Sequence, residues 1–132
     1  KALIDANIKI TALRDATRGG VSAVLNEWAK QSNICIEVEE EQIPISDEVK
    51  GICEMLGFEA TNLANEGTFL LAISKDDATK AIEVLHTFPE ASNASIIGKV
   101  TAQYPQKVIL NSSWGTKRFL DTPSGELLPR IC

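Results

Sequence analysis

The hydrophobic residues of this chain change their spacing repeatedly, from the alternation of a β-strand to the period of an α-helix and back. Residues 8–13 alternate in the manner of a strand. The next apolar residues follow at the spacing i, i+3, i+4 and i+7, on one face of a helix running to about residue 31: Val21, Val24, Leu25 and Trp28. A chain patterned in this way is expected to lay amphipathic helices on a sheet.

The same change of period recurs down the chain. Ile34, Ile36 and Val38 predict a half-buried strand whose other face is polar. Residues 68–73 are apolar on both faces, which predicts a central strand. A second helix is expected between a cap at Ser46 and an end at Gly57, with an apolar face of Val49, Ile52, Cys53 and Leu56. A third is expected to open at Ser74 and Asp77 and to end before Pro89, with an apolar face of Ala78, Ala81, Ile82 and Leu85. Strands are expected at 94–102 and 106–111, followed by a short hairpin of 116–120 with 126–128.

The predicted order of elements is β-α-β-α-β-α-β-β, followed by a tail. Three helices laid on one mixed sheet of about five strands give an α/β or α+β sandwich. The chain has 132 residues, of which 44% are hydrophobic, and this is enough for one packed core. We therefore expect an α/β domain over residues 1–121 and a C-terminal tail over residues 122–132.

Composition argues against several classes of function. The net charge is −5, and the Lys and Arg residues are scattered, so neither a nucleic-acid surface nor a nucleic-acid partner is expected. No apolar run approaches the roughly 20 residues that cross a bilayer, and no signal-peptide pattern opens the chain, so no membrane role is expected.

Three cysteines without a CxxC pair, and the single histidine His86, argue against a disulfide framework or a zinc site and fit a reducing cytoplasm. Because the chain starts at Lys1 and its single methionine is Met55, a domain of a longer protein is expected.

A glycine-containing loop, Asp15-Ala16-Thr17-Arg18-Gly19-Gly20, joins the first predicted strand to the first predicted helix. Backbone N–H groups and the helix dipole favour an anion at such a helix start. Thr17 adds a hydroxyl and Arg18 a guanidinium, and the two glycines would let the backbone approach a ligand closely. A turn that needs glycine φ angles, with Arg18 solvated, fits the same residues. The loop lacks the Gly-Lys-Ser/Thr ending of a Walker A motif.

Acidic and cysteine side chains form a second group of candidates. Glu66 lies beside Gly67 in a loop that leads into the predicted central strand, where its carboxylate could act as a general base. An ordinary exposed loop glutamate is the alternative. Cys35 and Cys53 occupy periodic positions and are interpreted as structural. A run of four acidic residues is interpreted as a solvated strand end without companion metal ligands: Glu37, Glu39, Glu40 and Glu41.

The last four residues are Pro129, Arg130, Ile131 and Cys132. A thiol on a final residue is tethered on one side only, so it can reach into a pocket as no mid-chain cysteine can. A thiolate is also a strong nucleophile that can hold an acyl-type group. Cys132 is therefore a candidate covalent carrier of a substrate, and an accidental cysteine in a frayed terminus is the alternative.

Together, the loop at 14–20, the later Asn65-Glu66-Gly67 and the ending Pro-Arg-Ile-Cys at 129–132 resemble the C-terminal domain of the HypE family. These are hydrogenase maturation factors of the PurM-like, AIR synthetase-related superfamily of ATP-dependent enzymes. The resemblance runs over essentially the whole chain. The glycine loop is shared more loosely across the superfamily, whereas the Pro-Arg-Ile-Cys ending is specific to HypE. The resemblance implies a PurM C-terminal type of fold, a layered α/β domain partly like ferredoxin.

The resemblance also implies a reaction. Cys132 would accept a carbamoyl group from the partner carbamoyltransferase HypF, and ATP-dependent dehydration would turn the S-carboxamide into a thiocyanate. The cyano group would then pass to iron held by HypC and HypD, for the NiFe-hydrogenase centre. Glu66 would be the base that deprotonates the carboxamide nitrogen. Phosphate oxygens would be steadied by the loop residues Thr17, Arg18, Gly19 and Gly20.

In that family an N-terminal domain supplies most contacts to ATP and Mg²⁺ and forms the homodimer interface, and this chain lacks it. The isolated chain is expected to fold but to bind ATP weakly or not at all. One alternative is another PurM-like ATP-dependent synthetase, of the aminoimidazole ribonucleotide or selenophosphate type, which needs no terminal thiol. The other is a non-catalytic docking module whose tail only binds a partner.

Overall fold

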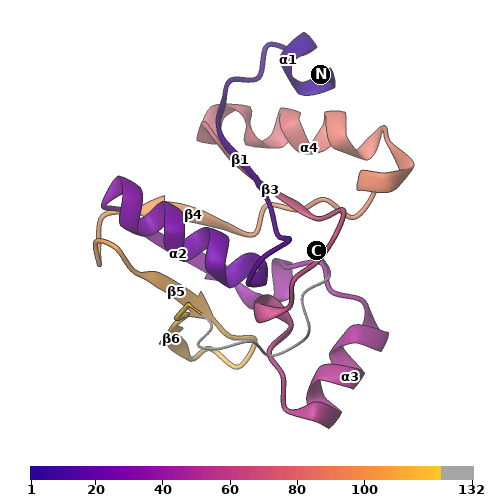
Figure 1. Ribbon diagram of the computed structural model, residues 1–132. Coiled ribbons are helices and arrows are strands. Elements are labelled where there is room, and N and C mark those ends of the chain that lie inside the picture. Colours follow the sequence, from indigo (N-terminus) through magenta and orange to yellow (C-terminus); the bar gives the residue numbers. More distant parts are fainter. Residues whose placement is uncertain (123–132) are drawn as a thin grey trace.

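The computed structural model describes residues 1–122 (Figure 1). Within them, strands and helices alternate in the predicted order, with one short helix added at the start. The α-helices are α1 (Ala2–Asp5), α2 (Gly20–Ser32), α3 (Asp47–Leu56) and α4 (Ala78–His86). The strands are β1 (Ile10–Asp15), β2 (Cys35–Glu39), β3 (Phe69–Ile73), β4 (Gly98–Thr101), β5 (Val108–Asn111) and β6 (Lys117–Phe119). Short 3-10 helices occupy connections: η1 (Glu40–Gln42), η2 (Ala60–Asn62), η3 (Lys75–Asp77) and η4 (Pro89–Ala91).

The strands of the described residues form two sheets. One is a mixed sheet in the order β4-β2-β5-β6, in which β2 and β5 are parallel with Ile36 opposite Val108. β4 and β6 pair antiparallel with β2 and β5 respectively. The other sheet is the antiparallel pair β1-β3, where Asp15 lies opposite Phe69. The α/β class with a mixed sheet is confirmed, although a single sheet was expected.

The expectation of a central strand at 68–73 is wrong. Among the described strands β3 pairs only with β1, and Phe69 at its start is 47% exposed. β3 is apolar because part of it packs against the cluster between α1 and α4. The inner strand is instead β2, which has a neighbour on each side. Its second face is covered as well, since Cys35 is 0% exposed and Glu37 is 9% exposed, so the prediction of a half-buried strand is also wrong.

The carboxylate of the buried Glu37 has partners on β5 and β6. Its Oε1 accepts a hydrogen bond from Asn111 Nδ2 at 3.0 Å and one from Lys117 Nζ at 3.2 Å. These contacts, with that of Asn111 the larger cause, hold the pKa of Glu37 below its usual range. The interpretation of Glu37 as part of a solvated strand end is therefore wrong, although the rest of the run, 39–41, is exposed.

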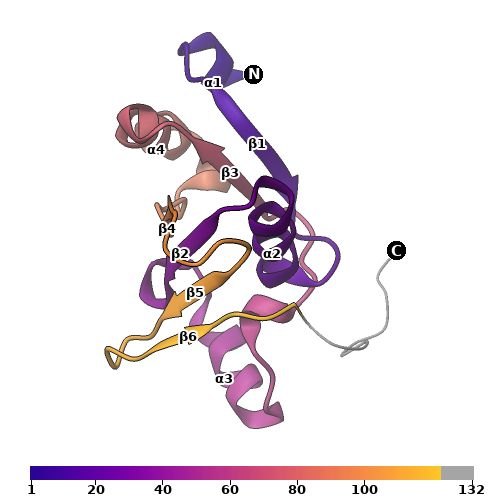
Figure 2. The ribbon, with the colours of Figure 1, turned by 90° about the vertical axis from the view of Figure 1, so that its left-hand side faces the viewer.

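The main hydrophobic core lies between α2 and the four-stranded sheet. Figure 2 shows α2 nearly end-on beside β2 and β5. The core unites buried residues of helix, sheet and loop: Ala16, Val24, Leu25, Ala29, Ile36, Val38, Ile43, Leu70, Val108, Leu110 and Leu120. A second, smaller cluster joins α1 to α4 through Leu3, Ile8 and Ala81. The helix face predicted for residues 21–28 thus packs on the sheet as expected.

The ends of α3 are as predicted, but most of its apolar face is not covered. Ser46 accepts a hydrogen bond from the backbone N–H of Val49 at 3.4 Å, and Gly57 ends the helix with a φ of 72°. Cys53 is 5% exposed, whereas Ile52 and Leu56 are 56% and 57% exposed. Both views place α3 at the margin of the molecule, opposite α4 (Figures 1 and 2). The predicted burial of this face is therefore wrong except at Cys53.

The last described strand, β6, forms a hairpin with β5. β6 pairs antiparallel with β5, with Ile109 opposite Phe119. Its expected partner at 126–128 lies outside the described residues. Beyond β6, Leu120 returns to the core with 2% exposure.

Candidate functional site

The two loops singled out in the sequence meet in the structure. The backbone N–H of Ala16 donates to the carbonyl of Thr68 at 3.0 Å, and the N–H of Asn65 donates to the carbonyl of Ala16 at 2.9 Å. Ala16 is 1% exposed, so these bonds are shielded from water. The β1-β3 pairing sets Asp15 opposite Phe69 and brings the adjoining ends of both loops together. The loop at 15–20 and the loop at 58–68 therefore act as one unit, which we call the paired loops.

Gly20, the first residue of α2, packs against the backbone of the second of the paired loops. Its φ is 66°, and a Cβ built at this position would lie 2.5 Å from the carbonyl oxygens of both Thr61 and Leu63. No side chain fits there without moving backbone. The space beside Gly20 is thus filled by this chain's own backbone, whereas the sequence had suggested close approach of a ligand.

The start of α2 has the electrostatic character of an anion site. Gly19 is the N-cap with a φ of 68°, no described side chain caps the helix, and its first turn holds no acidic residue. Among the described residues, no acidic side chain of the first turn therefore faces the positive end of this 13-residue helix. Arg18 is exposed directly beside it. Backbone N–H groups with an adjacent guanidinium are the donors that suit phosphate oxygens.

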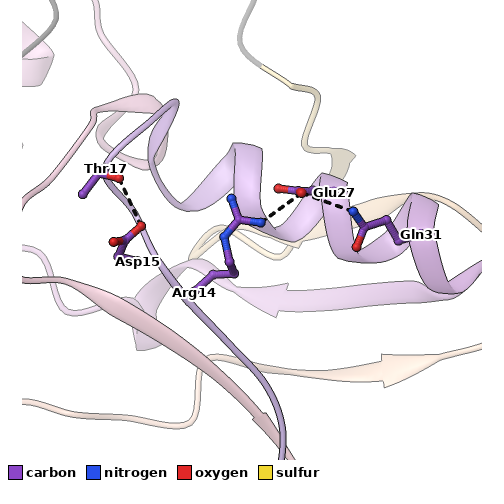
Figure 3. Close-up of polar contacts among 5 residues, drawn as sticks. All are labelled: Arg14, Asp15, Thr17, Glu27 and Gln31. Carbon is purple, nitrogen blue, oxygen red and sulfur yellow. Dashed lines mark hydrogen bonds and ion pairs between the residues drawn. The ribbon is translucent and has the colours of Figure 1, made fainter. Parts of the chain in front are cut away.

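The other polar residues of this region bind one another (Figure 3). Thr17 Oγ1 donates to Asp15 Oδ1 at 3.0 Å, so the carboxylate orients the hydroxyl. Arg14 Nη1 donates to Glu27 Oε1 at 2.9 Å, and Gln31 Nε2 donates to the same oxygen at 3.2 Å. These contacts tie β1 to the exposed side of α2. They engage the guanidinium of Arg14, whereas that of Arg18 takes no part in them.

Glu66 lies exposed in the second of the paired loops, directly after Asn65. It therefore belongs to the same unit as Arg18 and Gly19, as a base acting beside a phosphate site would have to. The predicted carrier Cys132 lies outside the described residues, as does the tail motif Pro129, Arg130 and Ile131.

Sequence reasoning missed one buried polar residue that links α2 to the end of the described chain. Asn26 is 6% exposed, and its Nδ2 donates to the carbonyl of Leu120 at 2.8 Å and to that of Ser22 at 2.9 Å. Nothing in the sequence pattern marks Asn26, because its partner is 94 residues away along the chain. A second contact, between Arg118 and Glu59 at 3.0 Å, links β6 to the start of η2.

The described part of the chain holds no metal centre built from protein ligands alone. Within residues 1–122 no three side chains of His, Cys, Asp or Glu gather so that they could hold a metal ion. Cys35 and Cys53 are buried free thiols, which confirms their structural interpretation. None of the described helices combines the length and the apolarity that a bilayer crossing needs.

Comparison with known proteins gives a match over most of the chain. The family model described as AIR synthase related protein, C-terminal domain, matches residues 1–111. The carbamoyl dehydratase HypE of Escherichia coli is 43% identical over 123 residues, which is 93% of this chain and 36% of the relative. That of Rhizobium leguminosarum bv. viciae is 41% identical over 93% of this chain and 35% of its own length. The chain thus spans little more than a third of these relatives.

The fold of this chain is also similar to solved structures of HypE proteins. A crystal structure of E. coli HypE, a hydrogenase maturation protein, has a TM-score of 0.90 with 42% identity, over 99% of this chain and 41% of that one. A HypE structure in complex with ATP has a TM-score of 0.86 with 35% identity, over 93% and 38%. A HypE-HypF complex has a TM-score of 0.84 with 37% identity, over 92% and 39%.

Proposed function

This chain belongs to the AIR synthase related C-terminal domain family, and from that membership we propose that it is the C-terminal part of a carbamoyl dehydratase of hydrogenase maturation. The observation that carries this proposal is the 43% identity with a carbamoyl dehydratase HypE over 93% of the chain. The relatives are much longer than the chain, so the activity belongs to the whole protein. We assign residues 1–121 to the α/β domain and residues 122–132 to a tail that carries the reactive cysteine.

The proposed reaction converts an S-carboxamide on Cys132 into a thiocyanate. ATP supplies the phosphoryl group that turns the carboxamide oxygen into a leaving group. The C–O bond breaks, the oxygen leaves with phosphate, ADP is released, and both N–H protons are removed as the S–C–N unit becomes linear. Water has to be excluded, because it would attack the activated carbon.

In this scheme Glu66 takes a proton from the carboxamide nitrogen. An exposed loop carboxylate suits this role if the Cys132 thioester-like group docks against it, because proton transfer needs contact within about 3 Å or through one water. The placement of Glu66 in the paired loops supports the assignment, since it lies in the same unit as the candidate phosphate donors. The paired loops would thus bring base and phosphate donors to one substrate.

The start of α2 would steady phosphate oxygens. Arg18 would supply a guanidinium, and Gly19 and Gly20 would supply backbone N–H groups. The hydroxyl of Thr17, which donates to Asp15 in this structure, would turn from that carboxylate to donate to a phosphate oxygen. Gly20 would act through its backbone alone, because its side-chain position is closed by the carbonyls at 61 and 63. The binding of ATP by a HypE relative supports this part of the proposal.

Most nucleotide contacts would come from the part of the relatives' length that this chain does not span. We therefore expect the isolated 132-residue chain to bind ATP weakly or not at all. We assign the Mg²⁺ ligands and a homodimer interface to the same missing part. The proposed partners are HypF, as in the HypE-HypF complex, and the HypC-HypD pair as acceptor of the cyano group. We place this activity in the cytoplasm.

Mass spectrometry of the full-length protein tests the proposal. Incubation with HypF, carbamoyl phosphate and ATP should give a carbamoyl adduct on Cys132, followed by loss of water from the same residue. Cys132→Ser should abolish both species. Glu66→Gln should take up the carbamoyl group and then dehydrate roughly 10²–10⁴-fold more slowly.

The matched control is Glu83→Gln, an exposed glutamate of α4, which should dehydrate at the parent rate. If the protein without Cys132 still supplies cyanide ligand to iron, the proposal is wrong and a synthetase of the aminoimidazole ribonucleotide or selenophosphate type becomes the better interpretation. If Cys132→Ser retains partner binding but the parent itself forms no thiocyanate, the chain is a docking module.

A further inference from the structure

A groove of about 490 Å³ lies between α3 and the turn that joins β5 to β6. We call it the α3 groove. Its lining includes Cys53 and Leu110, which are 5% and 1% exposed. It adjoins the candidate site through the loop at 58–68, because Thr61 lines the groove while its carbonyl oxygen lies 2.5 Å from the position of a Cβ on Gly20. The groove is thus a second concave surface beside the paired loops.

Trp114 lies at this groove and is 91% exposed, more than any other large hydrophobic residue of the described chain. The turn that carries it is held by backbone hydrogen bonds. The N–H of Ser112 donates to the carbonyl of Thr116 at 2.8 Å, and the N–H of Gly115 donates to the carbonyl of Ser112 at 3.1 Å. A fixed backbone therefore presents to solvent an indole that contributes little to the packing of the described chain. Tryptophan in such a position is the residue type that most often anchors a protein interface.

The α3 groove is also acidic. Four glutamates line it against two basic side chains, which leaves a net charge of −2: Glu40, Glu41, Glu54 and Glu59 against Lys50 and Arg118. Arg118 binds Glu59 at 3.0 Å, so these two charges neutralise each other. The other three carboxylates form no ion pair within residues 1–122. Three exposed carboxylates therefore face one ammonium group across this groove.

An indole and unpaired carboxylates favour the same kind of ligand group, an organic cation. The face of a tryptophan ring attracts a guanidinium or an ammonium within about 6 Å, and carboxylates bind the same groups through charge-assisted hydrogen bonds. A bare metal ion does not fit, because no three of the described carboxylates gather so that they could hold one. The groove therefore matches the long side chain of Arg or Lys.

Charge also narrows the choice of occupant. A second copy of this chain is unfavourable, because the chain carries a net charge of −5 and would bring further negative charge to an acidic groove. The segment 123–132 contains one Glu and one Arg, so it offers no excess of positive side chains. A segment of another protein that is rich in Arg or Lys complements both the carboxylates and the indole.

We propose that the α3 groove docks a basic segment of a partner protein. An Arg or Lys side chain of that segment lies on the indole of Trp114 and pairs with the carboxylates of Glu40, Glu41 and Glu54. The inference goes beyond the proposed function, which uses none of these residues. Because the contact is between charges near the surface, the complex should form faster and bind more tightly at low salt.

The first test uses the 132-residue chain with Trp28→Phe, in which Trp114 is the only tryptophan left. The probe is a short peptide that contains Arg and no aromatic residue, and the control peptide has citrulline, a neutral isostere, in place of each Arg. The Arg peptide should change the fluorescence of Trp114 in a saturable titration. The citrulline peptide should bind roughly 10-fold more weakly or worse. Calorimetric titration of the parent chain should show the same preference, which covers the case in which Trp28→Phe is poorly folded.

Variants of the groove separate its parts. Trp114→Ala and the double variant Glu40→Gln/Glu54→Gln should each weaken the Arg peptide roughly 10-fold, as measured by calorimetry. The double variant should also lose most of the salt dependence. The matched control Glu83→Gln/Glu90→Gln makes the same change of charge at exposed positions on and after α4, and should keep the parent affinity. Equal binding of the Arg and citrulline peptides, or equal effects of the two double variants, would overturn the inference.

The second test uses the full-length protein with its proposed partners. Trp114→Ala should weaken the complex with HypF or that with the HypC-HypD pair roughly 10-fold, while a carbamoylated protein still dehydrates at the parent rate. Parent affinity for both partners would overturn the inference. So would loss of a dimer of the chain in Trp114→Ala, which would make a second copy the occupant, or tighter peptide binding after deletion of residues 123–132, which would make the tail the occupant.

Failure of the proposed function looks different. The parent protein would then form no thiocyanate and bind neither partner, and the peptide titration alone would decide whether the α3 groove binds a basic segment.

Discussion

α2 and α3 carry similar sequence signals but end in different surroundings. α2 buries residues on several sides: Gly20, Ser22, Val24, Leu25, Asn26 and Ala29. α3 buries Cys53 alone. α2 packs on the four-stranded sheet, and its first residue meets the backbone at 61–63. α3 lies at the margin (Figure 2). The hydrophobic period shows which side of a helix is apolar, and the elements packed around it decide whether that side is covered.

This difference concerns function as well as packing. Each feature that we assign to the candidate site is attached to α2: the paired loops at its first turn and Leu120 at its middle. α3 contributes none of them among the described residues. The comparison therefore predicts that α2 tolerates little change and α3 tolerates much, and paired substitutions can test this.

The largest contrast is expected between two glycines. Gly20→Ala places a Cβ 2.5 Å from two carbonyl oxygens at a positive φ, so it should cost about 3 kcal/mol or more of unfolding free energy. Gly51→Ala in the interior of α3 meets nothing within 4 Å and should stabilise by about 0.5–1 kcal/mol. Urea unfolding of the 132-residue chain, followed by circular dichroism, measures both. Equal effects of the two substitutions would remove the distinction between the helices.

A smaller contrast is expected between two leucines. Leu25 is 3% exposed, so Leu25→Ala should cost about 2–4 kcal/mol through lost burial and the cavity it leaves. Leu56 is 57% exposed, so Leu56→Ala should cost under about 1 kcal/mol. The same unfolding titration compares them. If Leu56→Ala costs as much as Leu25→Ala, then α3 is covered in solution and the comparison fails.

The smallest effect concerns the sheet that supports α2. Because the pKa of Glu37 is lowered from 4.5 on folding, its carboxylate stabilises the fold above pH 4.5, and this stabilisation disappears as the pH falls through the lower folded pKa. Glu37→Gln should therefore lower stability at pH 7, with a difference from the parent that narrows below pH 4.5. Asn111→Ala should remove much of the same pH dependence, since Asn111 is the larger cause. Unfolding titrations between pH 3 and pH 7 would show a constant difference if Glu37 has no such role.

The local parts of the fold could be predicted from the sequence, and the long-range parts could not. Ser46 and Gly57 bound α3 as expected, because capping depends on residues within one turn. The separation of β1 and β3 from the other strands was missed, because periodicity contains no information on which strands pair. The burial of Glu37 was missed for the same reason, since its partners Asn111 and Lys117 come from strands far along the chain.

The candidate site also has features that the sequence predicted and features that it could not predict. The loop at 15–20 and Glu66 stood out in the sequence by residue type and position. That the two loops meet was not predictable, because it depends on the β1-β3 register and on the contact of Gly20 with the backbone at 61–63. Asn26 was also beyond prediction, because an amide in a helix gives no sign of a carbonyl partner beyond the last strand.

The inner place of β2 has a consequence for how the protein is made. Both of its neighbours, β4 and β5, follow it by about 60 residues or more in the chain, so a growing polypeptide on the ribosome carries β2 unpaired until they too have been synthesised. Its apolar residues Ile36 and Val38 are meanwhile free to associate with other chains. The newly made protein should therefore benefit from a chaperone that shields this strand until β4 and β5 have left the ribosome.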